Sequence, residues 1–204
     1  MNELVAQKRA MRDAGLKVRA AIPETGRDAA AVLAAQLFLR HIPAAAEVAS
    51  MVVSGWWPMP GEMDPRPLLL ELAAQGAITA LPVVTGRNHD LAFRAWDFTR
   101  ADVPPHGTHA IPAPDESAPL VVPGLVLAPF LAVDRAGWRL GYGGGYFDRT
   151  LRALRAAGTV LAVGLGFAAQ EVAAVPHDEF DARLDWVVTE QAAWHTDQAW
   201  KAER

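Results

Sequence analysis

Four glycines crowd the segment RLGYGGGYFDR, which runs from Arg139 to Arg149. Glycine lets the backbone bend sharply and bring its N–H groups close to a ligand. The residues from Tyr146 to Ala157 have the apolar spacing of a helix, and Gly158 is a suitable C-terminal stop. A glycine loop that leads into a helix N-terminus favours an anion, because unpaired N–H groups and the helix dipole both attract negative charge.

Two interpretations of this segment remain open from the residues alone, a phosphate-binding loop and a tight turn that merely needs glycine. Arg139 and Arg149 bracket the loop and could clamp phosphate oxygens, which favours the first. The segment matches neither the P-loop pattern GxxxxGK[ST] nor a regular GxGxxG pattern. The sequence therefore predicts an anion site and supports neither a P-loop nor a Rossmann assignment.

Length and composition predict one globular domain over residues 1–204, because half of the chain is apolar and the formal charge is only −4. There is no basic surplus that would suggest a nucleic-acid partner. No apolar run approaches the roughly 20 residues of a membrane span, and the polar N-terminus is unlike a signal peptide. The absence of cysteine excludes disulfides, thiolate metal sites and a cysteine nucleophile, and it fits a cytoplasmic protein.

Helical patterns alternate with short apolar runs along the chain. This alternation predicts a single layered α/β domain with a largely parallel central sheet flanked by helices. Asp28 and Asp64 are expected N-caps, residues 97–123 are an expected loop with His106 and His109, and the tail beyond Glu190 is an expected short helix or disordered segment. The expected helices are 2–21, 28–40, 64–75 and 146–157, and the expected strands are 48–54, 77–84, 91–96, 125–133, 159–167 and 185–189.

Two further segments carry candidate site residues. Trp56 and Trp57 are adjacent in a loop rich in proline and glycine, so at least one of them should face a cleft or partner, and ligand stacking and simple packing are equally compatible with the pattern. Glu62 could contact a ligand or be a solvated loop carboxylate. Lys8 and Arg12 are neighbours on one helix face, for which spacing alone favours a solvated surface. The tryptophan loop and the glycine loop both follow expected strands, so they can share one crevice.

Four separated segments together resemble the 5-formyltetrahydrofolate cyclo-ligase family, also called methenyltetrahydrofolate synthetases. Residues 8–12, KRAMR, resemble the family's KxxLR helix, and GWWP at 55–58 with EMD at 62–64 resembles its YxP…E[IV]D loop. The glycine segment is close to its RLGxGxGYYDR signature. Val175-Pro176, Asp181, Asp185 and Thr189-Glu190 resemble its closing VPxxxxDxxxDxxxTE run. The match covers nearly the whole chain in the same order.

The resemblance implies a fold similar to the sugar-phosphate isomerase and CoA-transferase-like group. It also implies an ATP- and Mg²⁺-dependent cyclisation of 5-formyltetrahydrofolate to 5,10-methenyltetrahydrofolate, with release of ADP and phosphate. The formyl oxygen would attack the γ-phosphate, N10 would close on the activated carbon, and phosphate would leave. The expected partners are reduced folate and ATP, and the expected oligomeric state is a monomer or weak dimer.

The resemblance also implies site residues. Arg139 and Tyr146 are catalytic candidates. Asp148 and Asp181 are Mg²⁺ ligand candidates, which the resemblance favours. From the residues alone, the first is a dipole-favoured acid in a first helical turn, and the second is a solvated residue or a strand cap. The folate candidates are Trp56, Trp57, Glu62, Tyr142, Gly143, Gly144, Gly145 and Tyr146. The ATP candidates are Lys8, Arg9, Arg12, Arg139, Leu140, Gly141, Tyr142, Gly143, Gly144, Gly145, Tyr146 and Phe147.

The chain departs from the family pattern at Trp56, Ala113, Val133 and Phe147, which stand where tyrosine, glutamate, phenylalanine and tyrosine are common. None of the four falls on the proposed phosphate or metal positions, so the chemistry is better supported than the choice of substrate. Two alternatives remain open, a non-catalytic folate- or nucleotide-binding relative and a sugar-phosphate isomerase or CoA-transferase-like enzyme. Turnover of ATP that depends on folate would separate the cyclo-ligase from the non-catalytic relative, and the isomerase or transferase chemistry would need neither ATP nor Mg²⁺.

Overall fold

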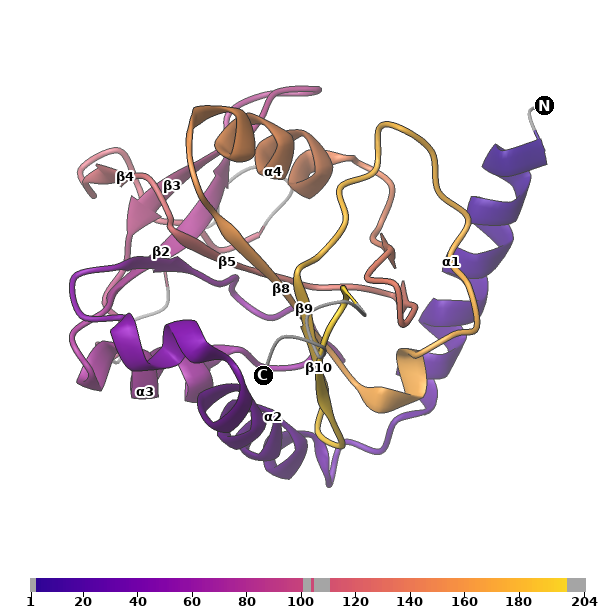
Figure 1. The fold of residues 1–204 in the computed structure, drawn as a ribbon, viewed down its shortest axis with the longest axis horizontal. Coiled ribbons are helices and arrows are strands. Elements are labelled where there is room, and N and C mark those ends of the chain that lie inside the picture. The colour runs from indigo at the N-terminus through magenta and orange to yellow at the C-terminus, as the bar shows by residue number, and fades with distance from the viewer. Residues whose placement is uncertain (1–2, 101–103, 105–110, 198–204) are drawn as a thin grey trace.

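The structure, a computed structural model, describes residues 3–100, 104 and 111–197. Within these residues an eight-stranded sheet has the order β10-β9-β8-β5-β1-β2-β3-β4, and β6 pairs with β7 beside it (Figure 1). The strands are β1 (Val52–Ser54), β2 (Ile78–Val84), β3 (Leu91–Ala95), β4 (Leu120–Val121), β5 (Leu125–Ala128), β6 (Ala132–Val133), β7 (Arg139–Leu140), β8 (Leu161–Leu165), β9 (Trp186–Val188) and β10 (Ala193–His195).

The middle of the sheet is parallel, from β9 through β8, β5 and β1 to β2, and the edge strands β10, β3 and β4 are antiparallel. β2 lies on one side of β1, whereas β5, β8 and β9 lie on the other. The strand order therefore reverses between β1 and β5, which is where ligands bind in open parallel sheets.

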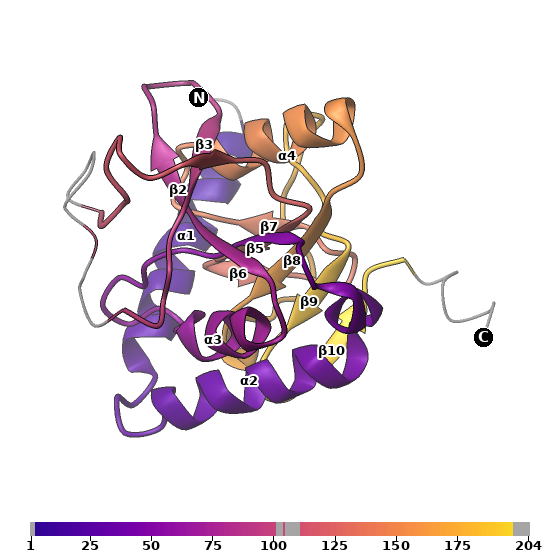
Figure 2. The ribbon, with the colours of Figure 1, turned by 90° about the vertical axis from the view of Figure 1, so that its left-hand side faces the viewer.

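Helices cover both faces of the sheet, which is why its central strands are continuously apolar. α2 (Arg27–His41) and α3 (Arg66–Ala74) lie on one face and α4 (Tyr146–Ala157) on the other (Figure 2). Successive side chains of β5 alternate between the two cores: Leu127 belongs to the core that contains Phe38 of α2, whereas Val126 belongs to the core that contains Leu151 of α4. The described residues also contain two short 3₁₀ helices, η1 (Pro43–Glu47) and η3 (Ala168–Gln170).

α1 (Glu3–Ala21) lies at one end of the sheet and contacts β6, β7 and η3 (Figure 1). Gly15 is its buried residue, and a Cβ built there would lie 2.6 Å from the carbonyl oxygen of Leu131. Lys8, Arg12 and Arg19 fall on the same stripe of the helix as Gly15, at spacings of four, three and four residues. The close approach at Gly15 thus brings three cations against the end of the sheet.

The structure confirms the α/β class with a mostly parallel sheet and corrects two helix starts. α2 begins at Arg27 with Gly26 as its N-cap, so Asp28 lies in the first turn. α3 begins at Arg66 with Pro65 as its N-cap. The Asp64 carboxylate accepts the Arg66 N–H at 2.9 Å and also pairs with the Arg66 guanidinium, so it braces the turn from one position further out.

Four expectations for strands and loops need correction. The run 48–54 forms a strand only from Val52, because a turn precedes it and Ser50 has a φ of +66°. The run 125–133 divides at Pro129, which has no N–H to continue the ladder. The expected loop 97–123 contains β4, and residues 193–195 of the tail form β10 rather than a helix or disordered segment. His106, His109 and the tail from 198 lie outside the described residues.

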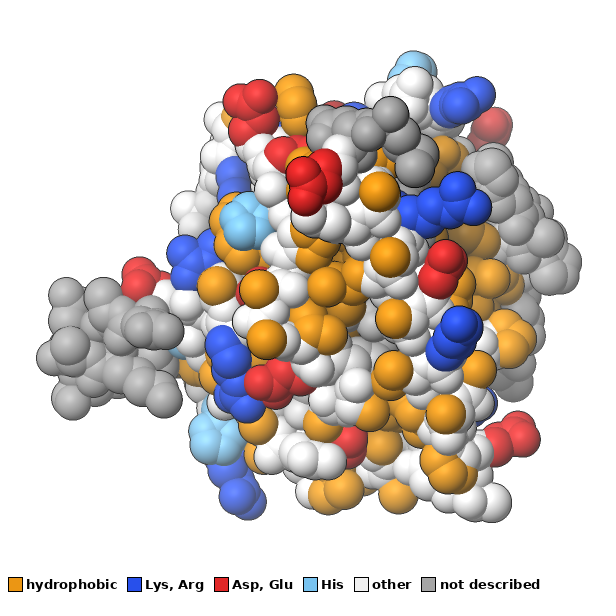
Figure 3. Space-filling view, turned by 90° about the vertical axis from the view of Figure 1, so that its right-hand side faces the viewer, with side chains coloured by type: hydrophobic (Ala, Val, Ile, Leu, Met, Phe, Trp, Pro, Cys, Tyr) orange, Lys and Arg blue, Asp and Glu red, His pale blue; other side chains and the backbone are white. Residues whose placement is uncertain are grey.

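None of the described helices is long and apolar enough to cross a membrane. The face on the α1 side of the molecule carries Lys and Arg interspersed with Asp and Glu among apolar side chains (Figure 3). The described part of that face shows no extended basic area.

Candidate functional site

A cavity of about 720 Å³ opens at the carboxyl ends of β1, β2 and β5, next to the reversal of strand order. Trp56 follows β1, Phe130 follows β5, and the glycine loop joins β7 to α4. A cavity of this size suits a small-molecule ligand.

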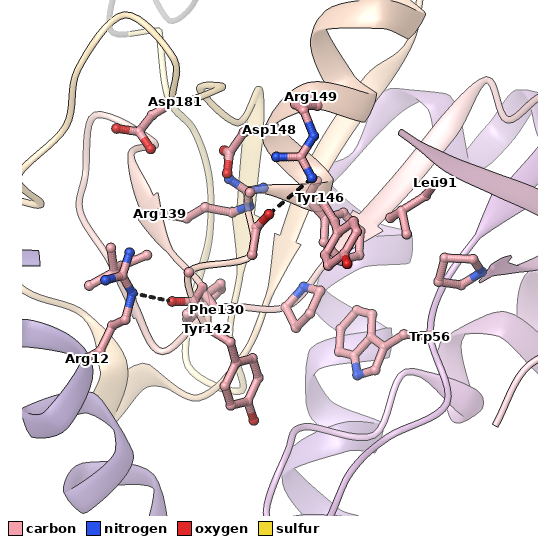
Figure 4. Close-up of a pocket in the computed structure, with 18 of the residues that line it drawn as sticks. Arg12, Trp56, Leu91, Phe130, Arg139, Tyr142, Tyr146, Asp148, Arg149 and Asp181 are labelled. Carbon is pink, nitrogen blue, oxygen red and sulfur yellow. Dashed lines mark hydrogen bonds and ion pairs between the residues drawn. The ribbon is translucent and has the colours of Figure 1, made fainter. Parts of the chain in front are cut away.

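The cavity has a charged end and an apolar end (Figure 4). Arg12, Arg139, Asp148 and Asp181 gather on one side, whereas Trp56 and Leu91 lie on the other, with Tyr146 between them. Further apolar lining comes from Trp57, Met59, Pro82, Val84, Ile111, Pro129 and Phe130. Such a division suits a ligand pair in which one member is anionic and the other flat and apolar.

The glycine loop has a backbone that only glycine adopts readily. Gly143 has a φ of +100°, and Gly145, the N-cap of α4, has a φ of +65°. No described side chain caps α4, so the N–H groups of its first turn keep their capacity to bind an anion. Arg12 Nε donates to Gly141 O at 3.1 Å, and Arg149 Nη2 donates to Gly144 O at 3.1 Å, so two arginines hold the loop in place (Figure 4).

Asp148 forms an ion pair with Arg139, whose side chain is 4% exposed. Arg139 Nη1 lies 2.6 Å from Asp148 Oδ1, and the Ala182 N–H donates to the same oxygen at 3.1 Å. No described residue donates to Oδ2. One oxygen is therefore fixed by the protein and the other is available to a ligand.

Asp181 repeats this arrangement on the neighbouring segment. Its Oδ2 lies 2.6 Å from Lys8 Nζ and accepts the Asp178 N–H at 2.8 Å, and no described residue donates to its Oδ1. Lys8 Nζ also donates to Asp178 Oδ2 at 3.1 Å. Burial alone disfavours the ammonium, but the hydrogen bonds to Asp181 and Asp178 outweigh it and hold the pKa of Lys8 above its ordinary value.

Asp178 is kept ionised by a backbone N–H and by Lys8. The Phe180 N–H donates to Asp178 Oδ1 at 2.9 Å, and this bond followed by Lys8 lowers the pKa of the Asp178 carboxyl. Lys8 and Asp178 are therefore held as a charged pair at this end of the cavity before any ligand enters.

The carboxylate oxygens at the charged end of the cavity decide what kind of metal site is possible there. The described residues contain no group of three or more His, Cys, Asp or Glu side chains that could hold a metal by themselves. Mg²⁺, however, is commonly bound through one or two carboxylates, with phosphate oxygens and waters as the other ligands. The open oxygens of Asp148 and Asp181 fit that mode, because the Ala182 N–H on Asp148 brings the two residues together.

Both tryptophans line the cavity, as expected for at least one of them. Trp56 is 5% exposed, and its buried Nε1 has no hydrogen-bond partner among the described residues. Trp57 is half-buried between two neighbours: it stacks on Phe98 at 6.3 Å between ring centroids, and the Arg66 guanidinium lies 5.1 Å from its ring. The indoles are held in place and still present surface to the cavity.

Glu62 is buried, with a side chain that is 5% exposed, so its interpretation as a solvated loop carboxylate is wrong. Its Oε1 accepts from Arg19 Nη1 at 3.2 Å and from Tyr142 Oη at 3.0 Å, and its Oε2 accepts the Met59 N–H at 3.0 Å. The interpretation of Lys8 as part of a solvated face is wrong as well, because its side chain is only 13% exposed and pairs with Asp178 and Asp181. Arg12 is half-buried and donates to Gly141 O.

The structure gathers the candidate residues at one cavity with one exception. Arg9 is exposed on α1 and is not part of the lining. Of the four departures, Trp56 and Phe147 line the cavity, whereas Ala113 and Val133 are buried outside it.

Sequence reasoning missed several lining residues. Asp178 and Phe180 lie inside the closing motif, and Arg152 lies three residues after Arg149 on α4, so each had a detectable signal. Leu91 and Phe130 had none, because strand pairing alone brings them to the cavity.

Comparison with known proteins gives consistent names. The 5-formyltetrahydrofolate cyclo-ligase family matches residues 4–190. A 5-formyltetrahydrofolate cyclo-ligase of Mycolicibacterium smegmatis is 30% identical over 184 residues, which are 84% of this chain and 89% of that protein. One of Escherichia coli is 31% identical over 143 residues, which are 66% of this chain and 75% of that protein.

Solved structures agree with this result. A 5,10-methenyltetrahydrofolate synthetase of Aquifex aeolicus has a TM-score of 0.74 at 25% identity, and the match covers 94% of this chain and 93% of that one. A 5,10-methenyltetrahydrofolate synthetase of Mycoplasma pneumoniae has a TM-score of 0.68 at 17% identity, covering 90% and 98%, and it supports the fold alone.

Proposed function

The chain belongs to the 5-formyltetrahydrofolate cyclo-ligase family, and we propose that it uses ATP and Mg²⁺ to convert 5-formyltetrahydrofolate to 5,10-methenyltetrahydrofolate, with release of ADP and phosphate. One observation carries the proposal: the glycine loop at the start of α4 and the Trp56–Trp57 loop open into the same cavity. A reaction between two bound substrates requires such a shared space.

The charged end would hold the ATP phosphates. Phosphoryl transfer depends on positioning and charge neutralisation more than on a side-chain nucleophile. The glycine-loop N–H groups and Arg12 supply positive potential there, and Lys8 uses two of its three N–H donors on aspartates and keeps one for a phosphate oxygen.

Asp148 and Asp181 would hold the Mg²⁺ through their open oxygens, together with phosphate oxygens. The ion would supply positive charge that offsets the charge on the transferring phosphoryl group. Arg139 then acts through Asp148, because the ion pair fixes the carboxylate and keeps its second oxygen directed away from the pair.

The apolar end would hold the folate. A pterin is flat and carries adjacent N–H donors, so it can stack against Trp56 or Trp57 and donate to the Glu62 carboxylate. Among the described residues only the Met59 N–H donates to Glu62 Oε2, which leaves a lone pair for such a donor. Leu91 and Phe130 would exclude water from the ring.

The reaction balances without an outside reactant. The formyl oxygen attacks the γ-phosphorus, the bond from that phosphorus to ADP breaks, and an imidate phosphate forms at N5. The N10 lone pair then attacks the formyl carbon, and the carbon–oxygen bond to phosphate breaks. N10 loses one proton when the ring closes, and the released phosphate carries one proton as hydrogen phosphate, so the protons balance. Tyr146 lies between the two ends of the cavity, so the reacting groups would meet beside it (Figure 4).

The test is to mix the purified chain with 5-formyltetrahydrofolate, ATP and Mg²⁺ and to follow the methenyl chromophore. We expect chromophore growth that needs both ATP and the metal and that falls about 100-fold in Asp148→Asn, the scale for losing one electrostatic contact to a transition state. Asp13→Asn is the matched control, because Asp13 is exposed on α1 outside the cavity.

A protein that binds ATP and folate without forming the chromophore would instead be a binding relative. Chromophore formation without ATP would contradict the ligase chemistry. Neither outcome is compatible with the proposed reaction.

A further inference from the structure

Glu62 is fixed by the protein before any ligand is bound. Three donors reach its carboxylate, from Arg19, Tyr142 and the Met59 N–H, at 3.2, 3.0 and 3.0 Å. The Glu62 N–H in turn donates to Met59 O at 2.9 Å, so two hydrogen bonds of opposite direction join Met59 and Glu62 across the turn. These protein donors, and not the substrate, therefore set the orientation of the Glu62 carboxylate.

Arg19 is the only cation among the described residues that forms an ion pair with Glu62. Its side chain is 11% exposed, and it does not line the cavity. It also falls outside every motif that carries the family resemblance. A buried carboxylate that loses its cation is left with an uncompensated charge, so the Met59–Glu62 turn would reorganise without Arg19.

Arg19 also contacts the glycine loop. Its guanidinium carbon lies 5.3 Å from the centre of the Tyr142 ring, and the Tyr142 hydroxyl donates to the same Glu62 oxygen that Arg19 contacts. One side chain of α1 thus touches both the Met59–Glu62 turn and the glycine loop.

We propose that Arg19 is a positioning residue that holds Glu62 and Tyr142 in one arrangement and so sets the affinity of the site for the folate. The inference rests on the proposed function. It gives α1 a division of labour: Lys8 and Arg12 reach the charged end of the cavity, and Arg19, on the same stripe, supports the folate end from behind.

The first test compares Arg19→Gln with Lys17→Gln, a control that removes the same charge from an exposed position of α1 outside the cavity. We expect Arg19→Gln to raise the KM for 5-formyltetrahydrofolate about 10-fold or more and to change the KM for ATP by less than about 2-fold. Arg19→Lys should recover part of the affinity, because it restores the charge but not the planar contact with Tyr142.

The second test is a double-mutant cycle with Tyr142→Phe and with Glu62→Gln. If Arg19 acts through these residues, its substitution should have a smaller effect on the folate KM in either background than in the wild type. Additive effects, or a loss of kcat and thermal stability with an unchanged folate KM, would overturn the proposal.

Failure of the proposed function would be seen separately, as a wild-type chain that forms no chromophore. The role of Arg19 would then be measured as the Kd for 5-formyltetrahydrofolate by calorimetry. Equal Kd values for the wild type and Arg19→Gln would overturn it.

Discussion

Asp148 and Asp181 show how single residues prepare this cavity. Each gives one oxygen to a cation and a backbone N–H and leaves the other oxygen open. A buried ion pair contributes little net stability, because desolvation offsets much of the attraction. The pairs are better explained as a way to fix the orientation of the two carboxylates before a ligand arrives.

Tyr142 provides a test at the same scale. Burial of the phenol, and after it the charge of Glu62, raise the pKa of Tyr142 above its ordinary value of 10.0. The pKa of Tyr142 is thus higher in the folded chain than in the unfolded chain. The protonated phenol therefore contributes fully to the free energy of unfolding below pH 10, and this contribution is lost as the pH rises through the pKa of the folded state. We expect Glu62→Gln to lower the pKa of Tyr142, measured by ultraviolet titration of tyrosinate.

The chain has two tyrosines, so Tyr146→Phe leaves Tyr142 as the single signal. The titration is best run in that background with and without Glu62→Gln. An unchanged pKa in the double variant would show that the contact between Tyr142 and Glu62 does not persist in solution.

At the scale of elements, α1 depends on a glycine. A Cβ at Gly15 would lie 2.6 Å from Leu131 O, a backbone atom that cannot rotate away. Gly15→Ala gains up to about 1 kcal/mol of helix propensity but overpacks the contact by about 1–3 kcal/mol, so we expect net destabilisation. The melting temperature should fall, and the KM for ATP should rise as Lys8 and Arg12 move outward.

Gly158→Ala is the control for Gly15→Ala. Its backbone is extended, and an added Cβ meets no atom within 4 Å. Differential scanning calorimetry of both variants measures the difference. Equal melting temperatures would contradict the close packing of α1 against Leu131.

Local patterns account for the elements that sequence predicted well. α4 runs from Tyr146 to Ala157 as expected, because glycines bound it and its apolar spacing is regular. Non-local pairing accounts for the failures. β10 has only three residues and exists because it pairs with β9, and no local signal distinguishes it from a loose tail.

At the scale of the whole molecule, the site depends on segments that sequence order separates. The family motifs identified most of the lining without geometry. They could not show that Lys8 reaches across 173 positions to Asp181, or that Arg19 reaches across 43 positions to Glu62. Spacing along α1 predicts only a charged face, and the partner that buries each charge comes from elsewhere in the fold.

Ligands should therefore stabilise the whole molecule. Each substrate alone, at about 100 times its Kd, should add about 2.7 kcal/mol and raise the melting temperature by about 5–10 °C. We expect Arg12→Gln to weaken the shift with ATP and Mg²⁺ and Trp57→Ala to weaken the shift with folate, measured by thermal scanning. Loss of both shifts in either single variant would contradict two separable ends of the cavity.

The position of α1 has a consequence for biosynthesis. This helix leaves the ribosome before every other described element, yet Arg12 binds Gly141 and Lys8 binds Asp178 and Asp181. The contacts of Lys8 can form only after residue 181 has been translated. A nascent chain thus carries its cations unpaired through most of translation, and closing so long a loop makes the docking of α1 a late step of folding.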